Sequence, residues 1–317
     1  CLNATGPIFL MMILGLFFRH IGWMDEEVAS KMNKFVFKVP LPLLLFGDLA
    51  TVDFSEVWNP KFGLFCFGAT FLCIGIIVTL ICIIISAGIS CLWKDKSIRG
   101  EFIQASYRSS AALLGIAFIQ NIYGNAGMAP VMIIGSVPLY NIMAVVVLSF
   151  FKPGQSKIDK EVLKKTLKGI ITNPIIIGIV VGLLWSAFRL PFSGIPAKTV
   201  TSIGNMATPM GLMAMGATFD IHKASAKAKP SIVAAVMKLV GFAAVFLPIA
   251  AGLGFKNEEI VAILVMLGSA TTVSSYVMAK NMGHEGVLTA STVMLTTMFS
   301  AFTLTGWLYI LKTLGIV

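Results

Sequence analysis

The sequence predicts an all-α polytopic membrane protein, with ten transmembrane helices in two inverted five-helix repeats. Hydrophobic residues make up 57% of the 317 residues, and charged residues only 12%. A soluble domain has about a quarter of its residues charged, so most of this surface must face lipid. Lipid offers the backbone no hydrogen-bond partners, which limits the spanning segments to helices or closed barrels. The apolar runs are long and continuous rather than alternating, which favours helices.

Ten apolar runs are each close to the roughly 20 residues that a bilayer requires. The expected spans are residues 2–18, 30–52, 62–92, 101–122, 128–151, 166–188, 197–219, 230–254, 258–280 and 287–312. The longest polar stretch joins the two halves. The expected division is a first repeat at 1–151, a cytoplasmic connector at 152–165 and a second repeat at 166–317. Lys and Arg are concentrated in alternate loops, which places both termini outside by the positive-inside rule. We expect location in a bacterial cytoplasmic membrane.

Matching residues recur at a constant offset in the two halves. Pro7 and Gly15 recur as Pro174 and Gly182, and the Ala-Thr-Val-Asp run that begins at Ala50 recurs as Ala-Thr-Phe-Asp. Because each half has an odd number of spans, the second half enters the membrane with the opposite orientation. Inverted repeats are typical of transporters whose binding site lies at the midplane, where the two halves meet.

The fourth and ninth spans are expected to break near mid-membrane. Both carry hydroxyl and small residues at matching places in the repeats, and these are Ser106, Ser109, Ser110, Gly115, Ser269, Thr271, Thr272 and Ser274. A broken helix leaves N–H and C=O groups that are tolerated only around a cavity, where they can bind an anion. The alternative is that these residues serve only close helix packing. Their matching positions favour a crossed pair of broken helices 4 and 9.

Two ionisable residues inside spans are candidates for the transport site. Arg108 precedes the expected break of span 4, where it could bind a carboxylate bidentately or extend to the lipid headgroups. Asp48 lies in span 2, where it could bind a coupling ion, H⁺ or Na⁺, or could cap the helix end near the outer interface.

Three further polar residues lie within apolar runs. Lys238 in span 8 could attract an anion or extend to the cytoplasmic headgroups. Asn141 and Asn205 are expected to be buried amides that bond each other, broken backbone or substrate.

Several function classes are excluded or disfavoured. The net charge of +10 lies in short loops between spans, which argues against nucleic acid as a partner. The histidines lack metal-ligand spacing, and no phosphate-binding G-x-x-x-x-G-K-[ST] loop occurs. We expect no cofactor beyond a coupling ion. An intramembrane enzyme would need a catalytic pair at membrane depth, and only Asp48 is a deep carboxylate.

The chain resembles the auxin efflux carrier family, which includes PIN-like plant exporters and bacterial malate-permease-like transporters. The resemblance rests on "MNKFVFKVPLPLLLF", "YRSSAALLGIAF", "VPLYNI", "NPIIIGIVVGLL" and "IGNMATPMGLMAMGATF" and covers nearly the whole chain. It implies ten helices, with 1, 2, 6 and 7 as a scaffold and 3–5 and 8–10 as a transport domain, and with helices 4 and 9 crossing. Three positions depart from the family pattern: Ala117 and Ala270 replace the crossover prolines, and Ser110 replaces an asparagine.

We therefore expect a secondary transporter of small organic anions, carboxylates such as malate, that works by alternating access and is not an enzyme. The expected substrate-binding residues are Arg108, Ser109, Ser110, Gly115, Asn141, Asn205, Ser269, Thr271, Thr272 and Ser274, and Asp48 is the expected coupling residue. The alternative is a membrane sensor that binds a small carboxylate without net transport. The expected partners are the anion and the lipid bilayer. The oligomeric state is left open, with a homodimer as one option.

Overall fold

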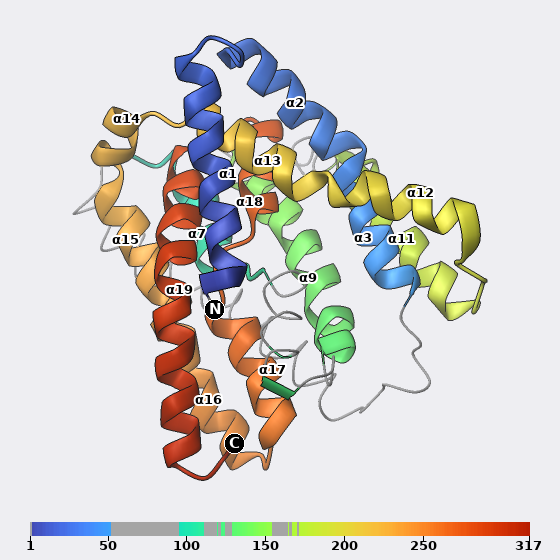
Figure 1. The fold of residues 1–317 in the computed structure, drawn as a ribbon, viewed down its shortest axis with the longest axis vertical. Helices are drawn as coiled ribbons and strands as arrows, with labels where there is room; N and C mark the ends of the chain where they lie inside the picture. The colour runs from blue at the N-terminus through green and yellow to red at the C-terminus, as the bar shows by residue number, and fades with distance from the viewer. Residues whose placement is uncertain are drawn as a thin grey trace.

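The protein is described by a computed structural model that covers residues 2–51, 95–110, 119, 122–123, 129–153, 164, 167–169 and 171–317. Within these ranges every regular element is a helix, which confirms the all-α class (Figure 1). The helices are α1 (Leu2–His20), α2 (Glu26–Lys38), α3 (Pro40–Ala50), α7 (Arg99–Tyr107), α9 (Ala129–Phe150), α11 (Pro174–Ala187), α12 (Gly194–Asn205), α13 (Ala207–Ala217), α14 (Ile221–Ala226), α15 (Ala228–Val236), the π-helical η3 (Met237–Gly241), α16 (Phe242–Gly252), α17 (Asn257–Gly268), α18 (Val273–Asn281) and α19 (Val287–Thr313).

Three stretches in the described part are long and apolar enough to cross a membrane: Ala228–Gly252, Asn257–Asn281 and Val287–Thr313. The third expected span, 62–92, and most of the connector at 152–165 lie outside the described residues. The number of spans and the inverted repeat therefore stay predictions.

Proline interrupts two of the expected spans. The 30–52 span forms α2 and α3, separated at Val39, with Pro40 as the first residue of α3. The 197–219 span forms α12 and α13, separated at Met206, and Pro209 lies in the first turn of α13. A proline in the first turn of a helix loses no hydrogen bond, whereas in the interior it breaks the helix. At both places one helix ends and the next begins, so no continuous helix is bent by proline here.

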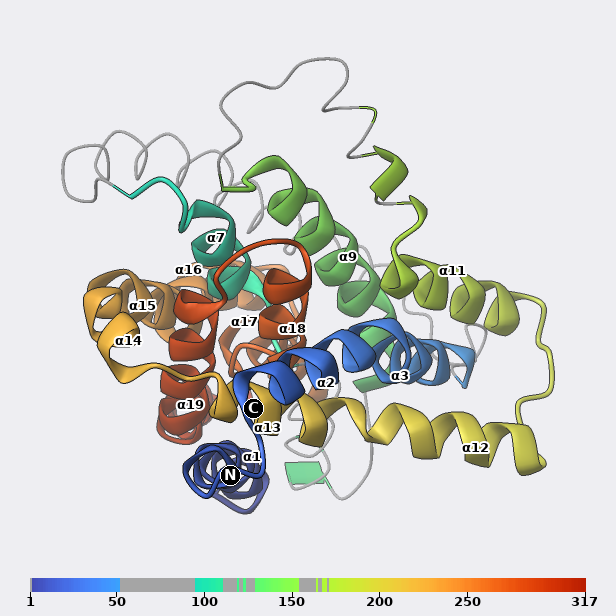
Figure 2. The same cartoon turned by 90° about the horizontal axis from the view of Figure 1, so that it is seen from above.

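Glycines bring the backbones of two helix pairs into direct contact. A Cβ atom at Gly216 of α13 would lie 2.1 Å from the carbonyl oxygen of Met12 in α1. A Cβ atom at Gly178 of α11 would lie 2.5 Å from the carbonyl oxygen of Pro42 in α3. Small residues at membrane-helix interfaces permit this approach, which increases van der Waals contact. Figure 2 shows α3 between α11 and α12, on the side of the molecule away from α15 and α16.

The most deeply buried element among the described helices is α17. Every residue from Ile260 to Leu267 is at most 2% exposed. Helices α9, α16 and α19 pack around it. Because α17 is apolar and shielded by other helices, its C-terminal end lies inside the protein rather than in lipid or water.

The long helix α19 is capped by a residue from another helix. Its N-cap residue is Gly286, which offers no side chain. The buried carboxylate of Glu101 in α7 accepts hydrogen bonds from Gly286 N at 2.8 Å and from Thr289 N and Oγ1, each at 3.0 Å. A carboxylate satisfies and charge-complements the N–H groups of a helix N-terminus, so Glu101 fixes α7 against the start of α19.

The backbone contact between α1 and α13 predicts a sharp cost for one methyl group. Gly216→Ala should lower the free energy of unfolding by roughly 1–3 kcal/mol because a backbone carbonyl cannot move aside. The matched control is Gly47→Ala in α3, where a Cβ atom meets nothing within 4 Å and alanine favours the helix by up to about 1 kcal/mol. Thermal unfolding in detergent measures both, and equal melting temperatures for the two variants would contradict this packing.

Candidate functional site

Two extended segments meet where two helices end inside the protein. Helix α7 ends at Tyr107, and Arg108 follows with φ −73° and ψ 128°. Helix α17 ends at Gly268, and the chain stays extended until α18 begins at Val273. The N–H of Ser110 donates a hydrogen bond of 2.8 Å to the carbonyl oxygen of Ala270. The two segments are thus joined by their backbones.

Side chains satisfy further backbone groups that these helix ends leave unpaired. The Thr271 hydroxyl donates to the carbonyl of Ala105 at 2.8 Å, and the Thr271 N–H donates to the hydroxyl of Thr296 at 3.0 Å. These two bonds pair groups that a continuous helix would have paired, which is the condition for an irregular backbone at membrane depth. The Gln104 amide also donates to the carbonyl of Ser275 at 2.9 Å, which joins α7 to α18.

A buried lysine lies at the C-terminal end of α17. Lys238 Nζ donates to the carbonyl oxygen of Leu267 at 2.5 Å and to the hydroxyl of Ser109. Ser109 in turn donates to the carbonyl of Met266, which also accepts from Tyr140 Oη at 2.9 Å. Lys238 is completely buried, so it does not extend to the headgroups. A cation at a helix C-terminus is favourable because the last carbonyls carry partial negative charge.

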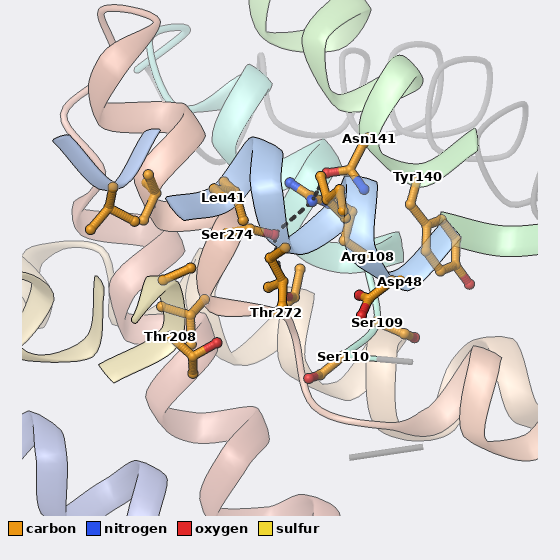
Figure 3. A pocket seen from close by; sticks show the side chains of 16 residues that line it. Leu41, Asp48, Arg108, Ser109, Ser110, Tyr140, Asn141, Thr208, Thr272 and Ser274 are labelled. Atoms are coloured by element: carbon orange, nitrogen blue, oxygen red, sulfur yellow. Dashed lines mark hydrogen bonds between the residues drawn. The ribbon is translucent and has the colours of Figure 1, made fainter. Parts of the chain in front are cut away.

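A cavity of about 60 Å³ opens beside the two extended segments (Figure 3). Predicted site residues that line it are Asp48, Arg108, Ser109, Ser110, Asn141, Thr272 and Ser274. This volume is the space open to the centre of a water-sized sphere, and a single water needs about 10–15 Å³ of it. The cavity can therefore hold several waters or a small solute. Its other wall is aliphatic.

Arg108 is the central cation of this cavity, and it is only 1% exposed. Its Nη2 donates to Asn141 Oδ1 at 2.7 Å and to Ser274 Oγ at 2.8 Å, and its Nη1 contacts Met278 Sδ at 2.9 Å (Figure 3). All three acceptors are neutral. Its Nε has no hydrogen-bond partner in the part of the chain that the structure describes. No carboxylate of the described residues lies within ion-pair distance of Arg108.

Asp48 reaches the same cavity from α3. It is half-buried. Among the described residues its carboxylate makes no hydrogen bond and no ion pair, with Arg108 or with any other group. Among the described residues, the cavity lining therefore has one cationic and one acidic side chain, and these two form no ion pair with each other.

Other predicted residues lie away from the cavity. Ser269 and Thr271 are buried but do not line it. Asn205 is exposed at the last turn of α12, so the expectation of a buried amide was wrong; the helix ends there before its side chain can face inward. Gly115 and Ala117 lie outside the described residues.

The sequence reasoning missed two polar residues that line the cavity, Tyr140 and Thr208. Tyr140 directly precedes Asn141, which is one of the predicted site residues. Thr208 directly precedes Pro209, which marks the start of α13. In both cases the polar residue could have been found from its neighbour in the sequence, Asn141 or Pro209.

The helix breaks around a buried polar cavity define a membrane transport protein. The chain matches the family described as "Membrane transport protein" over residues 2–308. It belongs to this family, which confirms the resemblance to auxin efflux carriers. It is an integral membrane protein.

The chain is similar to a curated relative and to a solved structure. An uncharacterized transporter of Methanothermobacter thermautotrophicus is 20% identical over 225 residues, which cover 68% of this chain and 67% of the relative. The sodium proton antiporter MjNhaP1 from Methanocaldococcus jannaschii, solved at pH 8, aligns with a TM-score of 0.56. That alignment has 15% sequence identity and covers 95% of this chain and 91% of the antiporter. At this identity the likeness extends to the fold alone.

The extended segment at Ala270 predicts that a proline is accepted there. The N–H of Ala270 makes no hydrogen bond with the described residues, and Ser269, with φ −76° and ψ 166°, already has the extended conformation required before proline. Ala270→Pro should therefore change the melting temperature by only a few degrees. Ala262→Pro, inside α17, loses a helical hydrogen bond and should cost about 3 kcal/mol or more. Equal losses of folded protein in detergent would show that Ala270 is not in an open segment.

Proposed function

We propose that this protein is a secondary transporter of small organic anions, carboxylates such as malate, and that it works by alternating access. The observation that carries the proposal is Arg108, a buried cation that lines a cavity and has no carboxylate partner among the described residues. An ionised group at membrane depth is costly and usually marks a functional site. An anionic substrate would supply the missing counter-charge.

The groups around Arg108 suit a carboxylate. Arg108 Nε–H has no partner among the described residues, and a guanidinium forms short, charge-assisted hydrogen bonds to carboxylate oxygens. Helix α18 begins at the cavity with Thr272, Val273 and Ser274 in its lining, and the side chain of its N-cap residue does not cap its N–H groups. The N–H groups of a helix N-terminus attract an anion. Thr272 and Ser110 add hydroxyl groups that can fix its orientation.

Alternating access needs two bodies that move past each other. We place α1, α2, α3, α11, α12 and α13 in the scaffold, and α7, α9 and α15 to α19 in the moving domain, in line with helices 1, 2, 6 and 7 against 3–5 and 8–10. Arg108 would then belong to the moving domain and Asp48 to the scaffold. The inverted repeat, the crossing of helices 4 and 9 and the outside location of both termini are part of this proposal.

Asp48 is the candidate for cation coupling. It is the cavity's carboxylate, and a proton or Na⁺ bound to it would offset the charge of an anionic substrate. The fold is similar to that of a sodium proton antiporter, a protein whose transported ions are Na⁺ and H⁺.

The first experiment is uptake of radiolabelled malate into proteoliposomes that contain the purified protein, with protein-free liposomes as the blank. Unlabelled malonate, succinate, lactate and indole-3-acetate compete for uptake. Saturable flux that at least one acid inhibits is the expected result. Binding of an acid without flux would favour a sensor, and neither binding nor flux in folded protein would overturn the proposal.

Substitutions at Arg108 and Asn141 test the anion site. Arg108→Gln removes charge-assisted hydrogen bonds worth about 1.5–3 kcal/mol, so the apparent affinity for the acid should fall by roughly 10-fold to 100-fold. Asn141→Asp places a carboxylate 2.7 Å from Nη2, which supplies an internal counter-charge and should abolish anion transport without lowering the melting temperature.

The matched control for both variants is Arg99→Gln, which removes an arginine from the first turn of α7, away from the cavity. It should transport as well as the unmodified protein. Full activity of Arg108→Gln would contradict the assigned role.

A further inference from the structure

Arg108 and Asp48 both line the cavity and have no oppositely charged partner among the described residues. Together they indicate a substrate that carries a charge of each sign. We propose that the substrate is a small zwitterion whose carboxylate binds Arg108 and whose ammonium group binds Asp48. This inference rests on the proposed transport function. It keeps the carboxylate of the proposed substrate and adds an ammonium group to it. An amino acid or another short molecule that carries both groups has the required chemistry.

Arg108 and Asp48 stand apart from the other buried charges of the described residues. Glu101 accepts three hydrogen bonds at the start of α19. Lys238 is bound to the Leu267 carbonyl at the end of α17 and is not part of the cavity lining. Only Arg108 and Asp48 both line the cavity and lack an oppositely charged partner in the described part of the chain.

The two charges are positioned so that a molecule between them can contact both. Asp48 lies in α3, and Arg108 directly follows the last residue of α7. They line one cavity, yet they are not within the 4.0 Å of an ion pair. Figure 3 shows both side chains at the cavity, where the Arg108 guanidinium is bound to Ser274 and Asn141. A solute that bridges this gap completes two ion pairs at once.

Charge balance favours a zwitterion over a simple anion. With Arg108 protonated and Asp48 ionised, the charges of the described side chains that line the cavity sum to zero. A bound monoanion would leave one net negative charge and would be repelled by Asp48, and charges interact strongly at low dielectric. A zwitterion leaves the sum at zero. Translocation would then need no separate cation, because the ammonium group takes the place of the coupling ion at Asp48.

Matched solutes in proteoliposomes test the proposal. Radiolabelled alanine, β-alanine and 4-aminobutyrate place the ammonium group at increasing distances from the carboxylate. Lactate replaces the ammonium of alanine by a hydroxyl, and protein-free liposomes measure the leak of each solute. We expect saturable uptake of at least one amino acid, at a rate at least tenfold above that of lactate. The preferred chain length then reports the separation of the two charges.

Asp48→Asn separates the two halves of the recognition. It should reduce amino-acid uptake at least tenfold and raise lactate uptake, because it removes the partner of the ammonium group and also the charge that repels an anion. Arg108→Gln should reduce the uptake of both. Glu27→Gln, which alters an exposed carboxylate of α2, should change neither. Melting temperatures of the purified variants in detergent establish that each one is folded. As a second measurement, amino acids should raise the melting temperature of the unmodified protein.

The outcomes distinguish this inference from the proposed function. Uptake of lactate or malate without uptake of any amino acid would overturn the zwitterion and leave the anion transporter standing. The same applies if lactate uptake requires a proton or Na⁺ gradient and Asp48→Asn removes that requirement. Absence of uptake and of thermal stabilisation by any of these acids would overturn both.

Discussion

The structure depends on one constraint, the need to satisfy backbone groups where helices end inside a membrane protein. Helices α7 and α17 both stop inside the protein, and each stop frees carbonyls and N–H groups that lipid cannot bind. The bond from Ser110 to Ala270, the hydroxyl of Thr271 and the ammonium of Lys238 satisfy several of these groups. The cavity exists because this set of bonds allows two helices to end at the same place.

The same arrangement divides the polar side chains into those that support the backbone and those that remain available. Ser109 and Lys238 bind carbonyls at the end of α17, so they support the backbone beside the cavity. Arg108 is held by neutral acceptors on two helices and keeps its charge uncompensated within the described residues. A cation held in this way is positioned before a ligand arrives, which reduces the entropic cost of binding.

The sequence predicted the helical class and the family, but not the direction in which each polar residue points. Hydrophobic run length and the matching clusters of the two halves located the break after Gly268. They could not distinguish Thr272 and Ser274, which face the cavity, from Ser269 and Thr271, which do not. That distinction depends on the rotation of an extended segment, which has no fixed period in the sequence. Asn205 was expected to be buried but is exposed at the last turn of α12, and Lys238 was not expected to bind a helix end.

The glycine contacts of α13 with α1 and of α11 with α3 have a mechanical consequence. Where backbone rests on backbone, as at Gly216 and Met12 or Gly178 and Pro42, neither surface contains a rotatable side chain that could yield. We therefore expect each of these helix pairs to move as one rigid unit. The cavity wall formed by α3 and α18 is different, because Leu41, Leu45, Val273 and Val277 line it with branched aliphatic groups. Such side chains can change rotamer, so this wall can adjust its shape where the glycine contacts cannot.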